Sequence, residues 1–243
     1  MSWLTRSLSS TMGKKLIVAA TGLFLCTFLV VHLIGNLQLL KNDGGEAFNH
    51  YAVFMTSNPL IKTVSYLLYA SILGHAFYGL YVLGKRNTTA RPVAYNTVNN
   101  SSAWTSRSMG VLGTMILAFI VGHMFDFWRE YHEYLGYKFE YYVTYADGKP
   151  MKNLYSEVME TFKSPIFAFG YVLAMLPIAF HLSHGFQSGF QTLGLNHPKY
   201  TPFIKSFGNI FSWGIMSLYA LIPIWVFFDL GSIIRSILHS IFG

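Results

Sequence analysis

The segment LIVAATGLFLCTFLVVHLIGNLQLL (residues 16–40) decides the fold class of this chain. It contains no acidic, lysine or arginine residue, and it exceeds the about 20 residues that a helix needs to cross the apolar layer of a membrane. His32 nevertheless lies well inside it. An ionisable ring in a membrane span is costly and usually functional. The segment therefore predicts a membrane-spanning helix whose histidine has a task.

The whole chain has the composition of a membrane protein. Of its 243 residues, 53% are hydrophobic and 11% are charged, whereas a soluble domain normally has about 25% charged residues. Long, largely uncharged stretches recur along the sequence, and each is long enough to span a membrane. We predict an all-α membrane protein with a single domain over residues 1–243. Its five transmembrane helices are expected at about 16–40, 59–84, 108–128, 164–194 and 207–234.

Charge asymmetry predicts the orientation of these helices. The N-terminal segment and the loops that follow the second and fourth helices contain basic residues and no acidic residue. By the positive-inside rule, these segments are cytoplasmic. The N-terminus is then cytoplasmic, and the C-terminus of a five-helix chain lies on the outer side. The basic residues concerned are Arg6, Lys14, Lys15, Lys85, Arg86, Arg91, Arg107, Lys199 and Lys205.

Four of the expected helices each contain a deeply placed histidine, namely His32, His75, His123 and His181. At 1.5 Å per residue, His32 lies about 25 Å and His123 about 24 Å above the inner helix ends. On the two helices that run inward, His75 lies about 15 Å and His181 about 20 Å above the inner end. Two depths emerge, and they predict that His32 pairs with His123 and His75 with His181.

Imidazole is the usual axial ligand of haem iron, so two such pairs could hold two six-coordinate haems. Glycines near the histidines would give a porphyrin room, although close helix packing also favours glycine. His184 is a rival to His181, one turn further along the helix. Cys26 is the only cysteine, which excludes a disulfide and a CxxCH haem attachment.

Two other functions would also use intramembrane histidines. A haem-free transporter or proton channel could use them as a proton relay. A membrane di-iron hydroxylase would need several clustered HxxH-type motifs, and only His181 and His184 have that spacing. The first alternative stays open; the second is disfavoured.

Several motifs carry a resemblance to a known family. They are ATGLFL (residues 20–25), FLVVHLIGN (28–36), GHAFYGLYV (74–82), VGHMFDFW (121–128) and HLSHGFQSGFQTLG (181–194). Together they resemble the cytochrome b membrane anchor of succinate:quinone oxidoreductases, in the single-chain, five-helix, dihaem form that includes fumarate reductases. The resemblance assigns the ligand of the fourth helix to His181.

The resemblance implies a function for the chain as one subunit of a bacterial respiratory complex in the cytoplasmic membrane. A flavoprotein subunit would interconvert succinate and fumarate, and an iron–sulfur subunit would pass electrons to the two b-type haems. The haems would exchange electrons with a membrane quinone, for which menaquinone is expected. The chain itself would carry the quinone reaction and no dicarboxylate site. The acid-free inner face is a candidate docking surface, with Lys85, Arg86, Arg91, Arg107 and Lys199.

In dihaem relatives quinone reacts near the upper haem, on the outer side. A carboxylate or imidazole there could exchange a proton with a quinone oxygen. The candidates are Glu46, His50, Asp126, Arg129 and Glu130. The chain departs from some fumarate-reductase relatives, because Ala179 stands where an acid can precede the fourth-helix ligand and Phe54 stands near the position of a loop acid.

Overall fold

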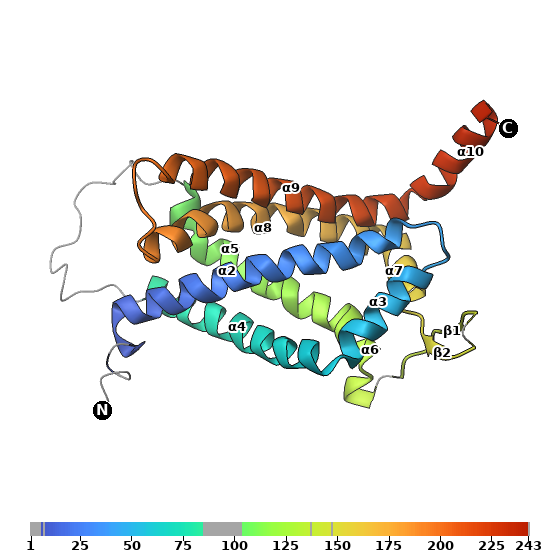
Figure 1. Cartoon of the computed structure of the whole chain (residues 1–243), viewed down its shortest axis with the longest axis horizontal. Helices are drawn as coiled ribbons and strands as arrows, with labels where there is room; N and C mark the ends of the chain where they lie inside the picture. The colour runs from blue at the N-terminus through green and yellow to red at the C-terminus, as the bar shows by residue number, and fades with distance from the viewer. Residues whose placement is uncertain (1–5, 7, 85–103, 137, 147, 243) are drawn as a thin grey trace. The chain divides into compact units, whose positions relative to one another are not determined.

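The computed structural model describes residues 6, 8–84, 104–136, 138–146 and 148–242. Five helices in this part of the chain are long and apolar enough to cross a membrane. This confirms the predicted all-α membrane architecture with five spans. The long helices are α2 (Thr11–Asn36), α4 (Pro59–Gly84), α5 (Trp104–His123), α8 (Pro165–Thr192) and α9 (Thr201–Phe227) (Figure 1).

Shorter elements connect the long helices. They are η1 (Leu37–Leu40), α3 (Glu46–Ser57), η2 (Met124–Trp128), α6 (Arg129–Tyr131), η3 (Tyr134–Gly136), β1 (Tyr142–Thr144), β2 (Pro150–Lys152), α7 (Leu154–Lys163) and α10 (Leu230–Phe242). Strands β1 and β2 are antiparallel, and Asp147, in the segment between them, lies outside the described residues.

Local sequence signals set the starts of two spans. Asn58 precedes α4, and its side-chain oxygen accepts hydrogen bonds from the backbone N–H of Leu60 at 2.9 Å and of Ile61 at 3.3 Å. Proline occupies the first position of both α4 and α8, where its missing N–H and fixed φ suit a helix start. Pro177 lies inside α8, and the helix continues past it.

The fifth span differs from its predicted range of 207–234. Helix α9 begins earlier, at Thr201, and ends at Phe227. Asp229 then adopts a left-handed conformation with φ 47°, which interrupts the helix because such a conformation breaks the regular hydrogen-bond pattern. A separate helix, α10, starts at Leu230. Hydropathy alone did not reveal this break, because apolar residues continue on both sides of it.

The chain divides into two compact units, and each long helix contributes to both because the boundaries fall within the helices. Unit 1 comprises Met1–Phe28, Tyr66–Leu117 and Pro177–Trp213. Its buried side chains are small or apolar: Ala19, Leu68, Ser71, Leu112, Ile178, Ala179 and Ser212. Two glycines allow close helix packing in this unit. A Cβ on Gly189 would lie 3.4 Å from the side chain of Leu23, and a Cβ on Gly208 would lie 2.8 Å from the ring of Phe186.

Unit 2 comprises Leu29–Ser65, Ala118–Leu176 and Gly214–Gly243. It contains the main hydrophobic cluster, formed by Leu33, Leu39, Phe48, Val158, Phe162, Ile222 and Val226. Three of its elements lie against one another outside the long helices: α3 contacts both α7 and the hairpin β1–β2. We call α3, β1–β2 and α7 the cap.

Asn49 holds the cap together. Its side chain is completely buried, and its Nδ2 donates hydrogen bonds to Tyr145 Oη at 2.9 Å and to Asn153 Oδ1 at 2.8 Å. Its Oδ1 accepts the backbone N–H of Tyr155 at 2.9 Å. One amide therefore forms hydrogen bonds with the segment that joins β1 to β2 and with the start of α7. Buried polar groups require such hydrogen-bond partners.

Gly45 makes the close approach of α3 and α7 possible. It precedes α3 with φ 88°, and a Cβ on it would lie 2.2 Å from Cγ of Tyr155. Any L side chain would be strained here and would collide with that ring. The glycine is therefore required on both counts.

Candidate functional site

Unit 1 brings His75 of α4 and His181 of α8 together. Their ring centroids are 6.2 Å apart, with an angle of 69° between the planes. The ring that faces His75 belongs to His181, although His184 lies one turn further along the same helix. The side chain of Ala179, two residues before His181, is 1% exposed, so the position that holds an acid in some relatives is a tightly packed alanine here.

The His75 ring is oriented by α2. Its Nδ1 lies 3.1 Å from the backbone carbonyl of Val18 and 3.3 Å from Oγ1 of Thr21. Gly22 lies beside the same ring, and a Cβ there would be 3.0 Å from Cε1 of His75. A carbonyl partner requires Nδ1 to carry the proton, which leaves the lone pair on Nε2. Histidines that bind metal usually have this arrangement.

Unit 2 brings His32 of α2 and His123 of α5 together. Their ring centroids are 5.8 Å apart, with an interplanar angle of 77°. Aromatic rings surround the pair. The ring centroid of Tyr219 lies 5.9 Å from that of His32. The ring centroids of Phe119 and Phe127 lie 5.8 Å and 5.5 Å from that of His123. The setting is aromatic, with a polar neighbour for each ring: the Asn36 amide nitrogen lies 3.3 Å from Nδ1 of His32, and Tyr171 lies beside His123.

Tyr171 of α8 connects His123 to Asp126. Its hydroxyl donates a hydrogen bond to Oδ2 of Asp126 at 2.8 Å. The hydroxyl oxygen of Tyr171 also lies 3.4 Å from Nδ1 of His123. Because the single hydroxyl proton points to the carboxyl group, the Tyr171 oxygen is left to accept the N–H of His123. Sequence analysis missed Tyr171, since nothing distinguishes it among the 16 tyrosines of the chain.

Both pairs fit a haem iron held between two imidazoles. A metal–imidazole bond is about 2 Å long, which places two rings on opposite sides of one iron with centroids about 6 Å apart. The observed spacings are 5.8 Å and 6.2 Å. In the described part of the chain, Nδ1 of His181 is buried without a hydrogen-bond partner, a condition that native proteins rarely leave unexplained.

Glycines near the histidines have different roles. Gly22 and Gly113 lie against the rings of His75 and His181, respectively. Gly35 instead makes room for Tyr51, whose Cε1 would lie 2.4 Å from a Cβ at that position. Among the described residues, no side chain of another element lies within 4 Å of the Cβ position of Gly74, Gly79 or Gly122, so these three leave open space on the helix surfaces.

The five quinone candidates form two groups in unit 2. On α3, Nε2 of His50 lies 3.9 Å from Glu46, and the His50 ring lies 5.6 Å from that of Tyr145. Beyond His123, the Arg129 guanidinium pairs with Glu130 at 3.2 Å, while Asp126 bonds to Tyr171 as described. Each group combines a proton-exchanging side chain with a partner that orients it.

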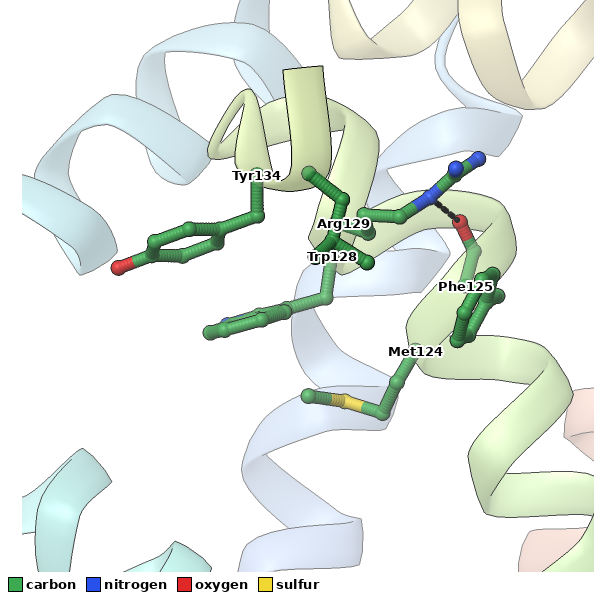
Figure 2. A pocket seen from close by; sticks show the side chains of 6 residues that line it. Met124, Phe125, Trp128, Arg129 and Tyr134 are labelled. Carbon is green, nitrogen blue, oxygen red and sulfur yellow. Dashed lines mark hydrogen bonds between the residues drawn. The ribbon is translucent and has the colours of Figure 1, made fainter. Parts of the chain in front are cut away.

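The chain between His123 and Arg129 is wound as a π-helix, η2. Single π-helical turns are rare and are frequent at functional sites. An open cavity of about 360 Å³ adjoins this turn; we call it the η2 cavity. In Figure 2 the Nε of Arg129 donates a hydrogen bond to the carbonyl of Phe125 at 3.3 Å. The lining residues are Met124, Phe125, Trp128, Arg129, Tyr134 and Leu135.

A second acidic group near the end of α5 was not predicted. Glu157 of α7 hydrogen-bonds to Glu130, and Glu140 adds further negative charge. Burial, followed by these two acids, raises the pKa of Glu157 to about 8. The sequence separation of Glu130 and Glu157 conceals their proximity, which only the packing of the cap creates.

Most of the candidate docking surface lies outside the described residues. This applies to Lys85, Arg86 and Arg91 and to the side chain of Arg107. Lys199 is described and exposed, and its Nζ lies 5.8 Å from the ring centroid of Tyr200.

Comparison with known proteins gives one similarity. The chain is 24% identical over 201 residues to the "Succinate dehydrogenase cytochrome b558 subunit" of Bacillus subtilis (strain 168), covering 82% of this chain and 88% of that protein. No family model and no solved structure matches the chain. The similarity confirms the resemblance that the sequence motifs indicate.

Proposed function

Because the chain resembles the cytochrome b anchors of succinate dehydrogenases, we propose that it is a dihaem anchor linking an iron–sulfur subunit to membrane quinone. The observation that carries this proposal is the presence of two histidine pairs, with ring centroids 5.8 Å and 6.2 Å apart. Each pair brings together rings from two different helices, which would hold a haem between these helices.

His32 and His123 would hold one b-type haem, and His75 and His181 the other. When bound, haem iron supplies reversible one-electron transfer. The protein's contribution is to hold and orient the rings. The Val18 carbonyl fixes the proton of His75 on Nδ1, and the Tyr171 oxygen does the same for His123. In both cases Nε2 remains available as the ligand.

The η2 cavity is the proposed quinone site. Its surface is entirely apolar, to which Arg129 contributes only the apolar part of its side chain, and a mostly apolar lining is typical of small-molecule sites. The Arg129 guanidinium lies beside Glu130. Reduction of a quinone to a quinol consumes two electrons and two protons. Arg129 would orient a quinone oxygen, and Glu130 beside it would hold a proton for transfer. Asp126, Glu46 and His50 are the further candidates for proton exchange with the outer side.

The partners follow from the same resemblance. A flavoprotein subunit would interconvert succinate and fumarate, and an iron–sulfur subunit would dock on the basic inner face, where Lys199 is exposed. The complex would be a succinate dehydrogenase or a quinol:fumarate reductase, with menaquinone as the expected quinone. The chain would lie in the bacterial cytoplasmic membrane with its N-terminus inside and its C-terminus outside.

Absorption spectroscopy of the purified chain tests the proposal. We expect a red protein with a reduced α-band of b-type haem and two haems per chain. A colourless, fully folded protein would instead favour the haem-free transporter or proton channel.

A quinone-turnover assay of the assembled complex tests the η2 cavity separately. Arg129→Gln should slow quinone turnover while both haems and dicarboxylate oxidation by an artificial electron acceptor are retained. Lys62→Gln is the matched control, because it removes an exposed cation at the start of another span. Equal turnover in the two variants would move the quinone site away from Arg129.

A further inference from the structure

Helix α10 belongs to unit 2 and is separate from the span α9 that precedes it. It follows α9 after a bend at Asp229, whose φ is 47°. The bend is fixed by hydrogen bonds from the Asp229 N–H to the Val226 carbonyl at 3.1 Å and from the Ser232 N–H to the Asp229 carbonyl at 3.0 Å. Figure 1 shows α10 continuing from the end of α9 in a new direction.

One side of α10 is apolar along its whole length. Isoleucine, leucine and phenylalanine recur at spacings of three and four residues, which place them on one helix face. Ile233, Ile234 and Ile237 are 47%, 42% and 51% exposed, respectively. The apolar positions in the sequence of α10 are Leu230, Ile233, Ile234, Ile237, Leu238, Ile241 and Phe242, and the positions between them are Gly231, Ser232, Arg235, Ser236, His239 and Ser240.

The preceding span determines what covers this face. Helix α9 has 27 residues, or about 40 Å at 1.5 Å per residue, which exceeds the about 30 Å of the apolar layer. The bend that follows α9 therefore lies at the boundary between lipid and water. Exposed apolar side chains continue across the bend, from Phe228 at 50% to Ile233 at 47%, so the lipid-facing surface of the span runs into the apolar face of α10.

We propose that α10 is an interfacial helix, which lies along the membrane surface with its apolar face in lipid and its polar face in water. A helix with one apolar face, a basic and hydroxyl-rich opposite face and no acidic residue has the composition of such elements. This inference rests on α9 being a membrane span and is independent of haem or quinone binding.

Site-directed fluorescence of the full chain in phosphatidylcholine vesicles tests the proposal. With Cys26→Ser as the background, Ile237→Cys and His239→Cys each receive one environment-sensitive label. Both positions are exposed in the protein but lie on opposite faces of α10, so only the bilayer can distinguish them. We expect lipid-attached quenchers to act severalfold more strongly on the label at 237, and aqueous iodide to act severalfold more strongly on the label at 239.

Three results would overturn the proposal. Equal quenching of both labels by iodide would place α10 in water. Protection of the label at 237 without lipid quenching, together with a disulfide-linked dimer of the unlabelled Ile237→Cys variant, would show that a second copy of the chain covers the face. Protection that appears only in the assembled complex would assign the face to another subunit. Ile233→Cys repeats the measurement if Ile237→Cys does not fold.

Discussion

The two histidine pairs have similar spacings but different surroundings. In unit 1, His75 is oriented by a backbone carbonyl and a threonine hydroxyl of α2. In unit 2, His123 contacts a tyrosine that bonds to a carboxyl group. A backbone partner fixes ring orientation with a neutral group, whereas the Tyr171–Asp126 pair brings a potentially anionic group within two hydrogen bonds of the ligand. If the histidines bind haem as proposed, unit 1 would fix ring geometry and unit 2 would also adjust the electronic character of His123.

The largest expected effect tests whether the pairs are independent. His181→Ala should remove one of two haems and leave the other, because the unit 2 pair shares no ligand with it. Haem content and reduced-minus-oxidised spectra of the purified variant measure the loss. His184→Ala is the matched control and should retain both haems. Loss of a haem in His184→Ala, with retention in His181→Ala, would reverse the assignment on α8.

A smaller effect should be confined to unit 2. Asn49→Leu removes the acceptor of the Tyr155 backbone N–H, and a buried group left unsatisfied costs about 1–3 kcal/mol. It also removes the donor to Tyr145 and to Asn153, whose oxygen still accepts the Ser156 N–H. The cap should loosen, and the His32–His123 haem should be lost at a lower temperature than the His75–His181 haem. Thermal melts followed in the two haem spectra measure this difference.

Asn196→Leu provides the control for the cap variant. Asn196 is exposed, and its side chain bonds to Thr201 in unit 1. It should therefore have little effect on either haem. A parallel decrease of both melting temperatures in Asn49→Leu would show that the units are not energetically separate.

A change of reduction potential tests the electronic difference between the pairs. Tyr171→Phe removes the hydroxyl between His123 and Asp126. The N–H of His123 then loses the oxygen that accepts it. The potential of that haem should rise on the order of 20–60 mV, the one-electron equivalent of about 0.5–1.5 kcal/mol for one hydrogen bond. Redox titration of both haems measures it, and the His75–His181 haem should not change.

Tyr219→Phe is the control for the potential measurement. The Tyr219 ring also lies beside a histidine of this pair, at 5.9 Å from His32, but its hydroxyl donates to the carbonyl of Leu29 at 2.8 Å. Its removal should therefore leave the potential nearly unchanged. Equal shifts in the two variants would assign the effect to ring packing.

The smallest expected effect is a pH dependence of the cap. The pKa of Glu157 is raised from 4.5 to about 8, so the protonated form is favoured in the folded cap. The stabilisation is complete below the ordinary pKa and is lost as the pH rises through 8. Hydrogen exchange of α7 in the original chain should therefore accelerate relative to Glu157→Gln as the pH rises from about 4.5 to about 8, and the ratio should level off above pH 8. A constant ratio across this range would contradict the raised pKa.

The histidine pairs were accessible from the sequence because depth along a helix depends only on residue count. His32 with His123 and His75 with His181 follow from that count, and the structure brings the same rings together. Their role as haem ligands remains a prediction. The five spans were equally accessible, since hydropathy over a membrane-length window needs no tertiary information.

Other features could not be predicted because they depend on packing between distant segments. Tyr171 reaches His123 only through the pairing of α5 and α8, and Glu157 reaches Glu130 only through the cap. The break at Asp229 was missed for a different reason. Apolar residues continue beyond it, so a window average merges the end of α9 with α10, and a single left-handed residue leaves no trace in hydropathy.

The π-helical turn η2 changes the direction in which side chains point around the helix axis, so the residues after it do not continue the regular rotation of α5. Each residue of a regular α-helix turns the chain by about 100°, and a π-helical turn accommodates one extra residue. An insertion or deletion of one residue within Met124–Trp128 would therefore rotate Arg129 and its neighbours about the axis while His123 keeps its direction. Relatives that differ in length at this turn should retain the histidine pair yet present a different set of side chains to the η2 cavity, so ligand chemistry and substrate recognition can diverge separately.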